Sequence, residues 1–139
     1  LALPDEGIII ALDKNIETNK IANDFFKKAN QDKKIKTIVK PALETLEEFK
    51  NDNLVFDIIF IDADKNNYKE YYDKVIQMTK QGGLIIIDNV LWHGEVADEE
   101  NNEKFTNIIR DFNTYVKNDK RTEQIILPLG DGLTICSKL

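Results

Sequence analysis

Apolar and amphipathic segments alternate along the whole chain of 139 residues. Short, continuous apolar runs rich in β-branched residues predict strands that are buried on both faces. Between these runs, apolar residues recur at helical spacing, as in Ile21, Phe25 and Ala29. The predicted strands cover residues 8–12, 35–39, 55–61, 84–87, 125–127 and 133–136.

Helix boundaries follow from proline and glycine. Pro41 predicts the start of one helix, and Gly82-Gly83 predicts the end of the helix that carries Tyr68, Tyr71 and Tyr72. No helix fits between the last two strands, so they should be antiparallel. The predicted fold class is therefore α/β, a mostly parallel sheet with helices on both faces and a C-terminal antiparallel strand pair.

Composition narrows the possible functions. The length predicts one domain over residues 1–139, and the net charge of −6 argues against nucleic-acid binding by bulk electrostatics. The single cysteine, Cys136, rules out an internal disulfide framework and fits a cytoplasmic protein. We expect no membrane span and no signal peptide, because no apolar run approaches about 20 residues and no cationic leader is present. The apolar opening without Met suggests a fragment.

The candidate chemistry lies where strands end, because ligands of open α/β sheets bind beyond the carboxyl ends of the strands. Asp13, Asp62 and Asp88-Asn89 follow three of the predicted strands. Asp62, Asp88 and Asn89 offer only oxygen ligands, which suit a hard cation such as Mg²⁺. The alternative for any single Asp is that it caps the next helix.

Asp13 and three further residues near these strand ends are candidates for other roles. Asp13 is placed to accept hydrogen bonds from ribose hydroxyls, although a helix-capping role is equally compatible with the sequence. Lys65 follows Asp62 by three residues, and an amine beside a bound cation can act as a general base. Trp92 and His93 follow Asp88 in a loop, which favours a substrate pocket.

Three stretches resemble the cation-dependent O-methyltransferases, a family that uses S-adenosylmethionine and includes caffeoyl-CoA and catechol O-methyltransferases. They are residues 60–68 (FIDADKNNY), 82–94 (GGLIIIDNVLWHG) and 127–133 (LPLGDGL). The resemblance implies a Rossmann-like methyltransferase fold. It also implies a hydroxylated small-molecule acceptor and a homodimer of the complete protein. One branch of the family methylates hydroxyuridine in tRNA, so tRNA is an alternative acceptor.

Carried over by residue, the resemblance implies a site for a divalent cation, a site for S-adenosylmethionine, a catalytic lysine and a substrate pocket. The cation ligands would be Asp62, Asp88 and Asn89, and the lysine would be Lys65. The cofactor residues would be Asp13, Ala42, Asp62, Asp64 and Tyr71. Trp92 and His93 would contact the substrate.

The family's N-terminal helices and its glycine-rich first strand have no counterpart in this sequence. The resemblance places that strand between the runs at 8–12 and 55–61. Without it, both of these runs would lose backbone hydrogen bonds. We therefore expect poor cofactor binding and no methyl transfer by these 139 residues alone. The alternatives from other classes are a non-catalytic interaction module and a metal-dependent phosphatase with Asp62 as nucleophile.

Overall fold

The chain forms two compact units in the computed structural model, which describes residues 3–139. Unit 1 extends to Glu48, and unit 2 covers Phe49–Leu139. Each unit has its own sheet, and each is described by itself below. The sequence-based prediction of one domain over residues 1–139 stays a prediction.

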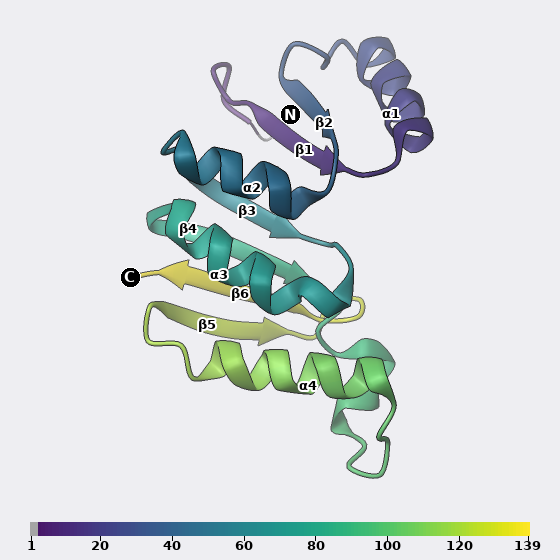
Figure 1. Ribbon diagram of the computed structural model, residues 1–139, viewed down its shortest axis with the longest axis vertical. Coiled ribbons are helices and arrows are strands. Elements are labelled where there is room, and N and C mark those ends of the chain that lie inside the picture. The colour runs from purple at the N-terminus through teal and green to yellow at the C-terminus, as the bar shows by residue number, and fades with distance from the viewer. Residues whose placement is uncertain (1–2) are drawn as a thin grey trace. The chain divides into compact units, whose positions relative to one another are not determined.

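Unit 1 contains a parallel pair of strands connected by a helix (Figure 1). Strand β1 (Ile9–Asp13) pairs with β2 (Ile35–Val39), and α1 (Ile16–Lys28) connects them. The side chain of Asn15 caps α1 by accepting hydrogen bonds from the N–H groups of the first turn. Helix α2 (Ala42–Asn51) begins directly after Pro41, as the sequence predicts.

Unit 2 contains a mixed four-stranded sheet in the order β3-β4-β6-β5. Strands β3 and β4 are parallel, whereas β6 is antiparallel to both of its neighbours, so the predicted C-terminal antiparallel pair is confirmed. The elements, in chain order, are β3 (Phe56–Ile61), the 3₁₀ helix η1 (Lys65–Asn67), α3 (Tyr68–Met78), β4 (Thr79–Asp88), the 3₁₀ helix η2 (Trp92–Ala97), α4 (Lys104–Lys117), β5 (Thr122–Leu127) and β6 (Leu133–Lys138).

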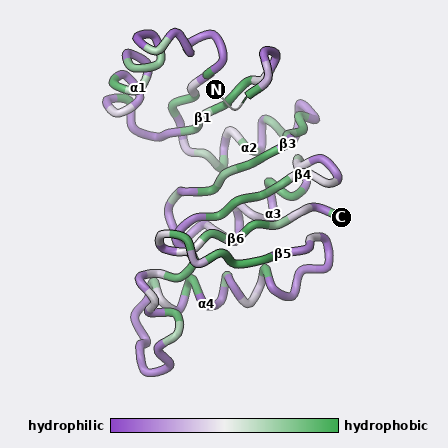
Figure 2. The backbone as a smooth tube through the Cα atoms, turned by 180° about the vertical axis from the view of Figure 1, so that it is seen from behind, coloured by the Kyte–Doolittle hydropathy of each residue, from purple (hydrophilic) through white to green (hydrophobic). Residues whose placement is uncertain are grey.

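The two faces of this sheet differ in burial. Helices α3 and α4 lie over one face in Figure 1, and there Ile85, Ile87 and Cys136 are fully buried. Figure 2 looks onto the other face, where the strands lie in front of the helices and are coloured as apolar. On that face Phe60 and Ile125 are each 57% exposed. Only one face of the sheet is therefore packed within unit 2.

The glycine pair 82–83 does not end a helix, so that prediction was wrong. Helix α3 ends at Met78, and the glycines lie inside β4, which begins at Thr79 rather than at residue 84. Gly82 has a φ of +74°, and the pairing of β4 with β3 is irregular at this point. Glycine is favoured by such a strand irregularity as strongly as by a helix end.

Among residues 3–139, strand β1 pairs with β2 alone, and strand β3 pairs with β4 alone. Strands β1 and β3 are those between which the resemblance places a further strand.

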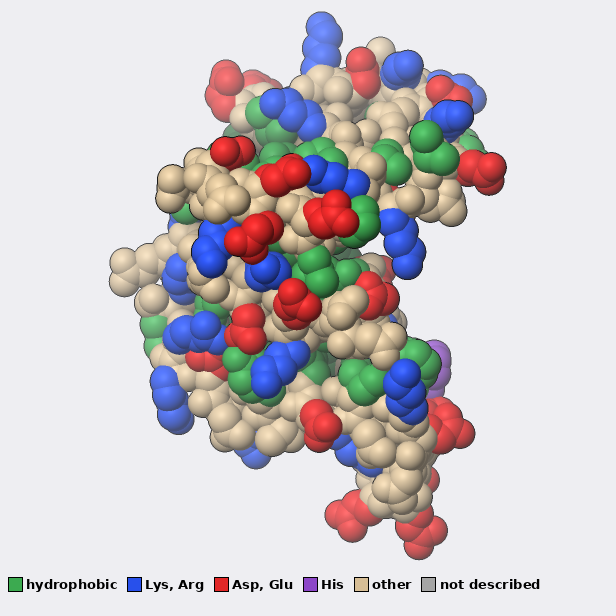
Figure 3. All heavy atoms as spheres, in the orientation of Figure 1, with side chains coloured by type: hydrophobic (Ala, Val, Ile, Leu, Met, Phe, Trp, Pro, Cys, Tyr) green, Lys and Arg blue, Asp and Glu red, His purple; other side chains and the backbone are tan. Residues whose placement is uncertain are grey.

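The polar segment at residues 98–103 leads from η2 to α4. Figure 3 shows acidic side chains protruding at this end of unit 2. The guanidinium group of Arg110 donates hydrogen bonds to the carbonyl oxygens of Val96 and Asn101, at 3.0 and 2.6 Å. No helix within residues 3–139 is long and apolar enough to cross a membrane.

Two glycines with positive φ provide a matched test of the packing in unit 2. A Cβ atom on Gly132 would lie 2.4 Å from Cγ of Leu91, whereas one on Gly82 would meet nothing within 4 Å. Gly82→Ala should therefore lower the free energy of unfolding by about 1–2 kcal/mol, the cost of left-handed backbone. Gly132→Ala should lower it by about 1–3 kcal/mol more, because Leu91 must move. Urea denaturation of both variants measures the difference, and equal losses would contradict the predicted clash.

Candidate active site

The parallel pairing of β3 with β4 brings the predicted site residues of unit 2 to one edge of the sheet. Ile61 pairs with Ile87, so Asp62 and Asp88 both follow at the carboxyl ends of adjacent strands. Asn89 continues from β4 with a φ of +57°, a left-handed conformation that asparagine tolerates better than most residues. The backbone N–H of Asn89 donates to Oδ1 of Asp88 at 2.6 Å.

The ammonium group of Lys65 links the two strand ends. Its Nζ donates a hydrogen bond to Oδ1 of Asn89 at 2.8 Å and lies 3.6 Å from Oδ1 of Asp62. The lysine side chain is only 11% exposed, whereas that of Asp62 is 53% exposed. Side-chain oxygens from both strand ends therefore face one buried positive charge.

Tyr68 holds Lys65 in this position, a role that the sequence analysis missed. The hydroxyl of Tyr68 accepts a hydrogen bond from Nζ of Lys65 and donates one to the carbonyl oxygen of Asp88, at 3.0 Å. Burial raises the pKa of this phenol, and the negative charges of Asp62, Asp88 and Asp64 raise it further. The helical spacing of Tyr68 indicated only a core residue. The signal in the sequence that could have indicated its contact with Lys65 is that Tyr68 follows Lys65 by three residues.

Asp64 and Tyr71, both predicted to bind the cofactor, contact each other. The hydroxyl of Tyr71 donates to Oδ2 of Asp64 at 2.7 Å, and the side-chain amide of Asn67 donates to Oδ1 at 2.7 Å. Burial, with the hydrogen bond to Asp64, raises the pKa of Tyr71 to about 12. This carboxylate is therefore fixed beside the strand end, with both of its oxygens engaged.

The predicted substrate residues lie in the segment that follows Asn89. Trp92 and His93 both have positive φ, at 49° and 56°, which is strained for residues of this size. Their rings are 5.7 Å apart, and Trp92 also packs on Phe105 at 5.9 Å. The side chain of His93 is 75% exposed.

The remaining predicted cofactor residues, Asp13 and Ala42, belong to unit 1. Asp13 accepts hydrogen bonds from the backbone N–H of Asn15 and the hydroxyl of Thr18, at 2.9 and 3.0 Å, and these bonds lower the pKa of the Asp13 carboxyl. Ala42 is the first residue of α2, where backbone N–H groups have no partner within the helix. Their roles in cofactor binding stay predictions.

The oxygen atoms around Lys65 fit a divalent cation. Asp62, Asp88 and Asn89 supply carboxylate and amide oxygens, the ligands that Mg²⁺ prefers. Two of these side chains already face a positive charge, that of Lys65. Within residues 3–139, no group of three or more His, Cys, Asp or Glu side chains is arranged to hold a metal, and this set has only two carboxylates. Metal binding therefore belongs among the proposals.

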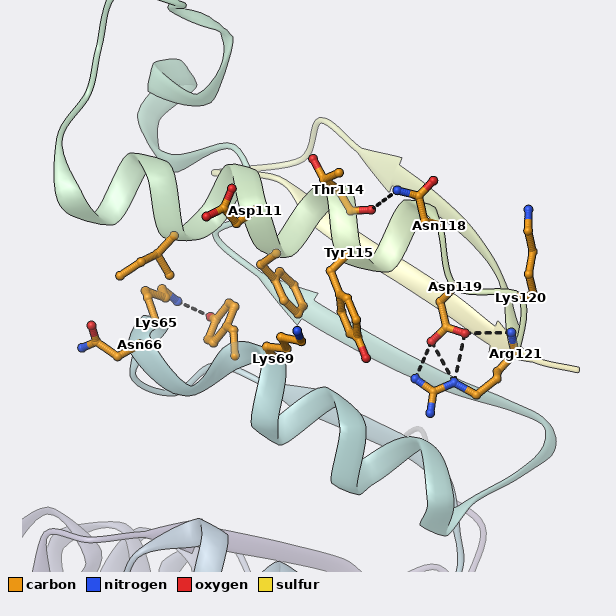
Figure 4. A pocket seen from close by; sticks show the side chains of 13 residues that line it. Lys65, Asn66, Lys69, Asp111, Thr114, Tyr115, Asn118, Asp119, Lys120 and Arg121 are labelled. Atoms are coloured by element: carbon orange, nitrogen blue, oxygen red, sulfur yellow. Dashed lines mark hydrogen bonds and ion pairs between the residues drawn. The ribbon is translucent and has the colours of Figure 1, made fainter.

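A separate groove of about 680 Å³ runs between α3 and α4 (Figure 4). Lys65 and Asn66 lie at one end, and Asp119 and Arg121, which form an ion pair at 2.7 Å, lie at the other. Lys65 thus lines this groove as well as contacting Asn89. The groove itself was not predicted, because its residues come from helix faces that the sequence marks only as amphipathic.

The structure has an α/β fold with acidic side chains at the carboxyl ends of its strands. The sequence profile described as O-methyltransferase matches residues 1–139. The chain therefore belongs to the O-methyltransferase family, and the resemblance described above is confirmed. This match decides against the phosphatase alternative.

Individual relatives agree with this assignment. The chain is 40% identical, over 148 residues, to the caffeoyl-CoA O-methyltransferase of Petroselinum crispum, covering 100% of this chain and 61% of that protein. Its structure is similar to the Bacillus cereus O-methyltransferase in complex with SAH. The TM-score is 0.88 and the identity 28%, over 99% of this chain and 65% of the other. The chain thus spans about three fifths of the length of the curated relatives it matches.

The four tyrosines should all ionise at higher pH in the folded chain than in the unfolded chain, because every one has a raised pKa. They are Tyr68, Tyr71, Tyr72 and Tyr115. Below the unfolded pKa of about 10 both states are neutral, so this contribution to stability is fully present. As the pH rises further, the unfolded chain ionises first and stability falls. Phenolate absorbance measured against pH, with and without denaturant, checks this. A folded-state midpoint near 10 would contradict it.

Proposed function

We propose that this protein transfers the methyl group of S-adenosylmethionine to a hydroxyl of a catechol-like acceptor, with a divalent cation bound by Asp62, Asp88 and Asn89. The observation that carries the proposal is the convergence of Asp62 and Asn89 oxygens, from two strand ends, on the ammonium group of Lys65. Such an arrangement binds positive charge where an acceptor oxygen must become negative. The similarity to caffeoyl-CoA O-methyltransferases supports an acceptor with neighbouring oxygens.

When bound, the cofactor supplies an electrophilic methyl group and the cation makes a hydroxyl of the acceptor more acidic. Lys65 accepts the hydroxyl proton at Nζ as the neutral amine, so its ammonium group first releases a proton to solvent. Tyr68 holds Lys65 in place through its hydroxyl, because that hydroxyl is itself anchored to the Asp88 carbonyl. The fixed positions of these groups lower the barrier mainly by orientation and electrostatics.

Each unit, considered separately, contains proposed cofactor residues. In unit 2, Asp64 is held by Tyr71 and Asn67 and lies beside the methyl-transfer site that we propose. In unit 1, Asp13 binds the ribose and Ala42 offers its backbone to the adenine. We further propose a homodimer of the complete protein and a cytoplasmic location.

The cation site predicts a specific loss on mutation. Asp62→Asn should weaken Mg²⁺ binding by about tenfold, equivalent to about 1.4 kcal/mol, because a carboxylate ligand becomes neutral. Isothermal titration calorimetry of Mg²⁺ against the 139-residue chain measures this. Asp57→Asn is the matched control, since Asp57 lies in β3, the strand that Asp62 follows, but pairs with Lys80 at 2.6 Å. Equal Mg²⁺ affinities for the two variants would overturn the ligand assignment.

Methyl transfer itself is tested in the complete protein. Mass spectrometry should detect methylated catechol when S-adenosylmethionine, catechol and Mg²⁺ are present, and Asp62→Asn should lower the amount of product when Mg²⁺ is limiting. Chelation of the cation should have the same effect. Undiminished transfer with excess chelator would overturn the role of the cation.

Replacing Lys65 by an uncharged residue should have opposite effects on Mg²⁺ binding and on catalysis. Lys65→Met should tighten Mg²⁺ binding several-fold, because a positive charge 2.8 Å from Asn89 and 3.6 Å from Asp62 is removed. The same change should lower kcat for catechol methylation by about 10²–10⁴-fold, because the general base is lost. Lys65→Arg keeps the charge and should leave Mg²⁺ affinity close to that of the unmodified chain. If Lys65→Met weakens Mg²⁺ binding, Lys65 does not compete with the cation.

A further inference from the structure

The turn between β5 and β6 holds the segment that leaves the carboxyl end of β4. The backbone N–H of Val90 donates to the carbonyl oxygen of Gly132 at 3.2 Å, and that of Leu91 donates to the carbonyl oxygen of Asp131 at 2.9 Å. Gly132 lies so close to Leu91 that no side chain fits between them. The segment that follows Asn89 and carries Trp92 and His93 is here called the substrate segment. Its backbone is therefore fixed by the β5–β6 hairpin, which comes from a distant part of the sequence.

The side chain of Asp131 continues this contact as far as His93. Its Oδ1 accepts a hydrogen bond from the backbone N–H of His93 at 2.5 Å. Its Oδ2 is buried and has no hydrogen-bond partner, and it lies 3.9 Å from Nδ1 of the His93 ring. The side chain of Asp131 is 16% exposed, whereas that of His93 is 75% exposed.

A buried carboxylate oxygen without a hydrogen-bond partner is unfavourable, and more so when it is charged. The ring nitrogen of His93 is about 1 Å beyond hydrogen-bond distance, so a small rotation of the exposed ring satisfies this oxygen. That bond requires a proton on Nδ1. In neutral imidazole the other nitrogen, Nε2, then carries a lone pair and accepts hydrogen bonds.

We propose that Asp131 is a positioning residue, which holds His93 in the Nδ1–H tautomer and thereby presents Nε2 as a hydrogen-bond acceptor to a hydroxyl of the methyl acceptor. The inference rests on the proposed function for the identity of that hydroxyl. The contact between Asp131 and His93 does not depend on the proposed function. The strained, left-handed backbone at Trp92 and His93 is the conformation that this contact stabilises.

The tautomer of His93 can be measured directly, because His93 is the only histidine in the chain. Two-bond ¹H–¹⁵N correlation spectra of the untagged, ¹⁵N-labelled chain at about pH 8.5, where free histidine is neutral, report which ring nitrogen carries the proton. We expect the Nδ1–H form to predominate, the reverse of free histidine. A predominant Nε2–H form in the unmodified chain would overturn the proposal.

Asp131→Asn should reverse the tautomer ratio. The asparagine oxygen still accepts from the backbone N–H of His93, but its NH₂ group then faces Nδ1 and requires that nitrogen to be unprotonated. Asp111→Asn is the control for the loss of one negative charge, since Asp111 is an exposed residue of α4. If both variants change the ratio equally, Asp131 has no specific effect.

Titration with catechol and Mg²⁺ tests the role in acceptor binding. The ¹⁵N signal of Nε2 should shift in the unmodified chain and shift at least several-fold less in Asp131→Asn. An Nε2 signal that does not respond would overturn this role. Failure of the methyltransferase proposal is identified separately, by the Mg²⁺ calorimetry of Asp62→Asn, which does not involve His93.

Discussion

The parallel pairing of β3 with β4 is the constraint on which the candidate site depends. The register of Ile61 with Ile87 places residues 62 and 88 at the same edge of the sheet, although 26 positions separate them in the sequence. Parallel strands require a crossover connection, and α3 provides it while covering one face of the sheet. The connection also carries Lys65 and Tyr68 at its beginning. The same segment thus completes the sheet and supplies the charged centre of the site.

At this charged centre, a positive side chain lies close to carboxylate and amide oxygens in a partly buried region. Lys65 is the positive partner of Asp62 and Asn89, and Tyr68 stays a neutral hydrogen-bonding group because burial and nearby carboxylates oppose its ionisation. A cation that enters among these oxygens must displace or repel the ammonium group of Lys65. Cation binding and the freedom of the lysine to take a proton are therefore linked in the function that we propose.

The sequence predicted the fold class and the strand ends well, because both depend on local patterns. The range of β2 and the antiparallel hairpin followed from apolar runs and from the absence of a helix between two of them. The glycines at 82–83 were assigned to a helix end, although they lie in a strand, because glycine is favoured both at helix ends and at strand irregularities. The exposure of Phe60 and Ile125 was not predictable either, because an apolar run does not reveal which face is covered. The contact of Asp131 with His93 spans 38 residues and has no local signal.

The strand order also affects how the chain folds during synthesis. Strand β6 (Leu133–Lys138) follows β5 in the sequence, yet in the sheet it lies between β4 and β5. As the chain leaves the ribosome, β4 and β5 are complete before the strand that joins them has been made. Until residues 133–138 emerge, β3 and β4 can pair, but β4 and β5 each have a free edge and the four-stranded sheet cannot be completed. During this interval the nascent chain has unpaired strand edges, which favour pairing with other chains.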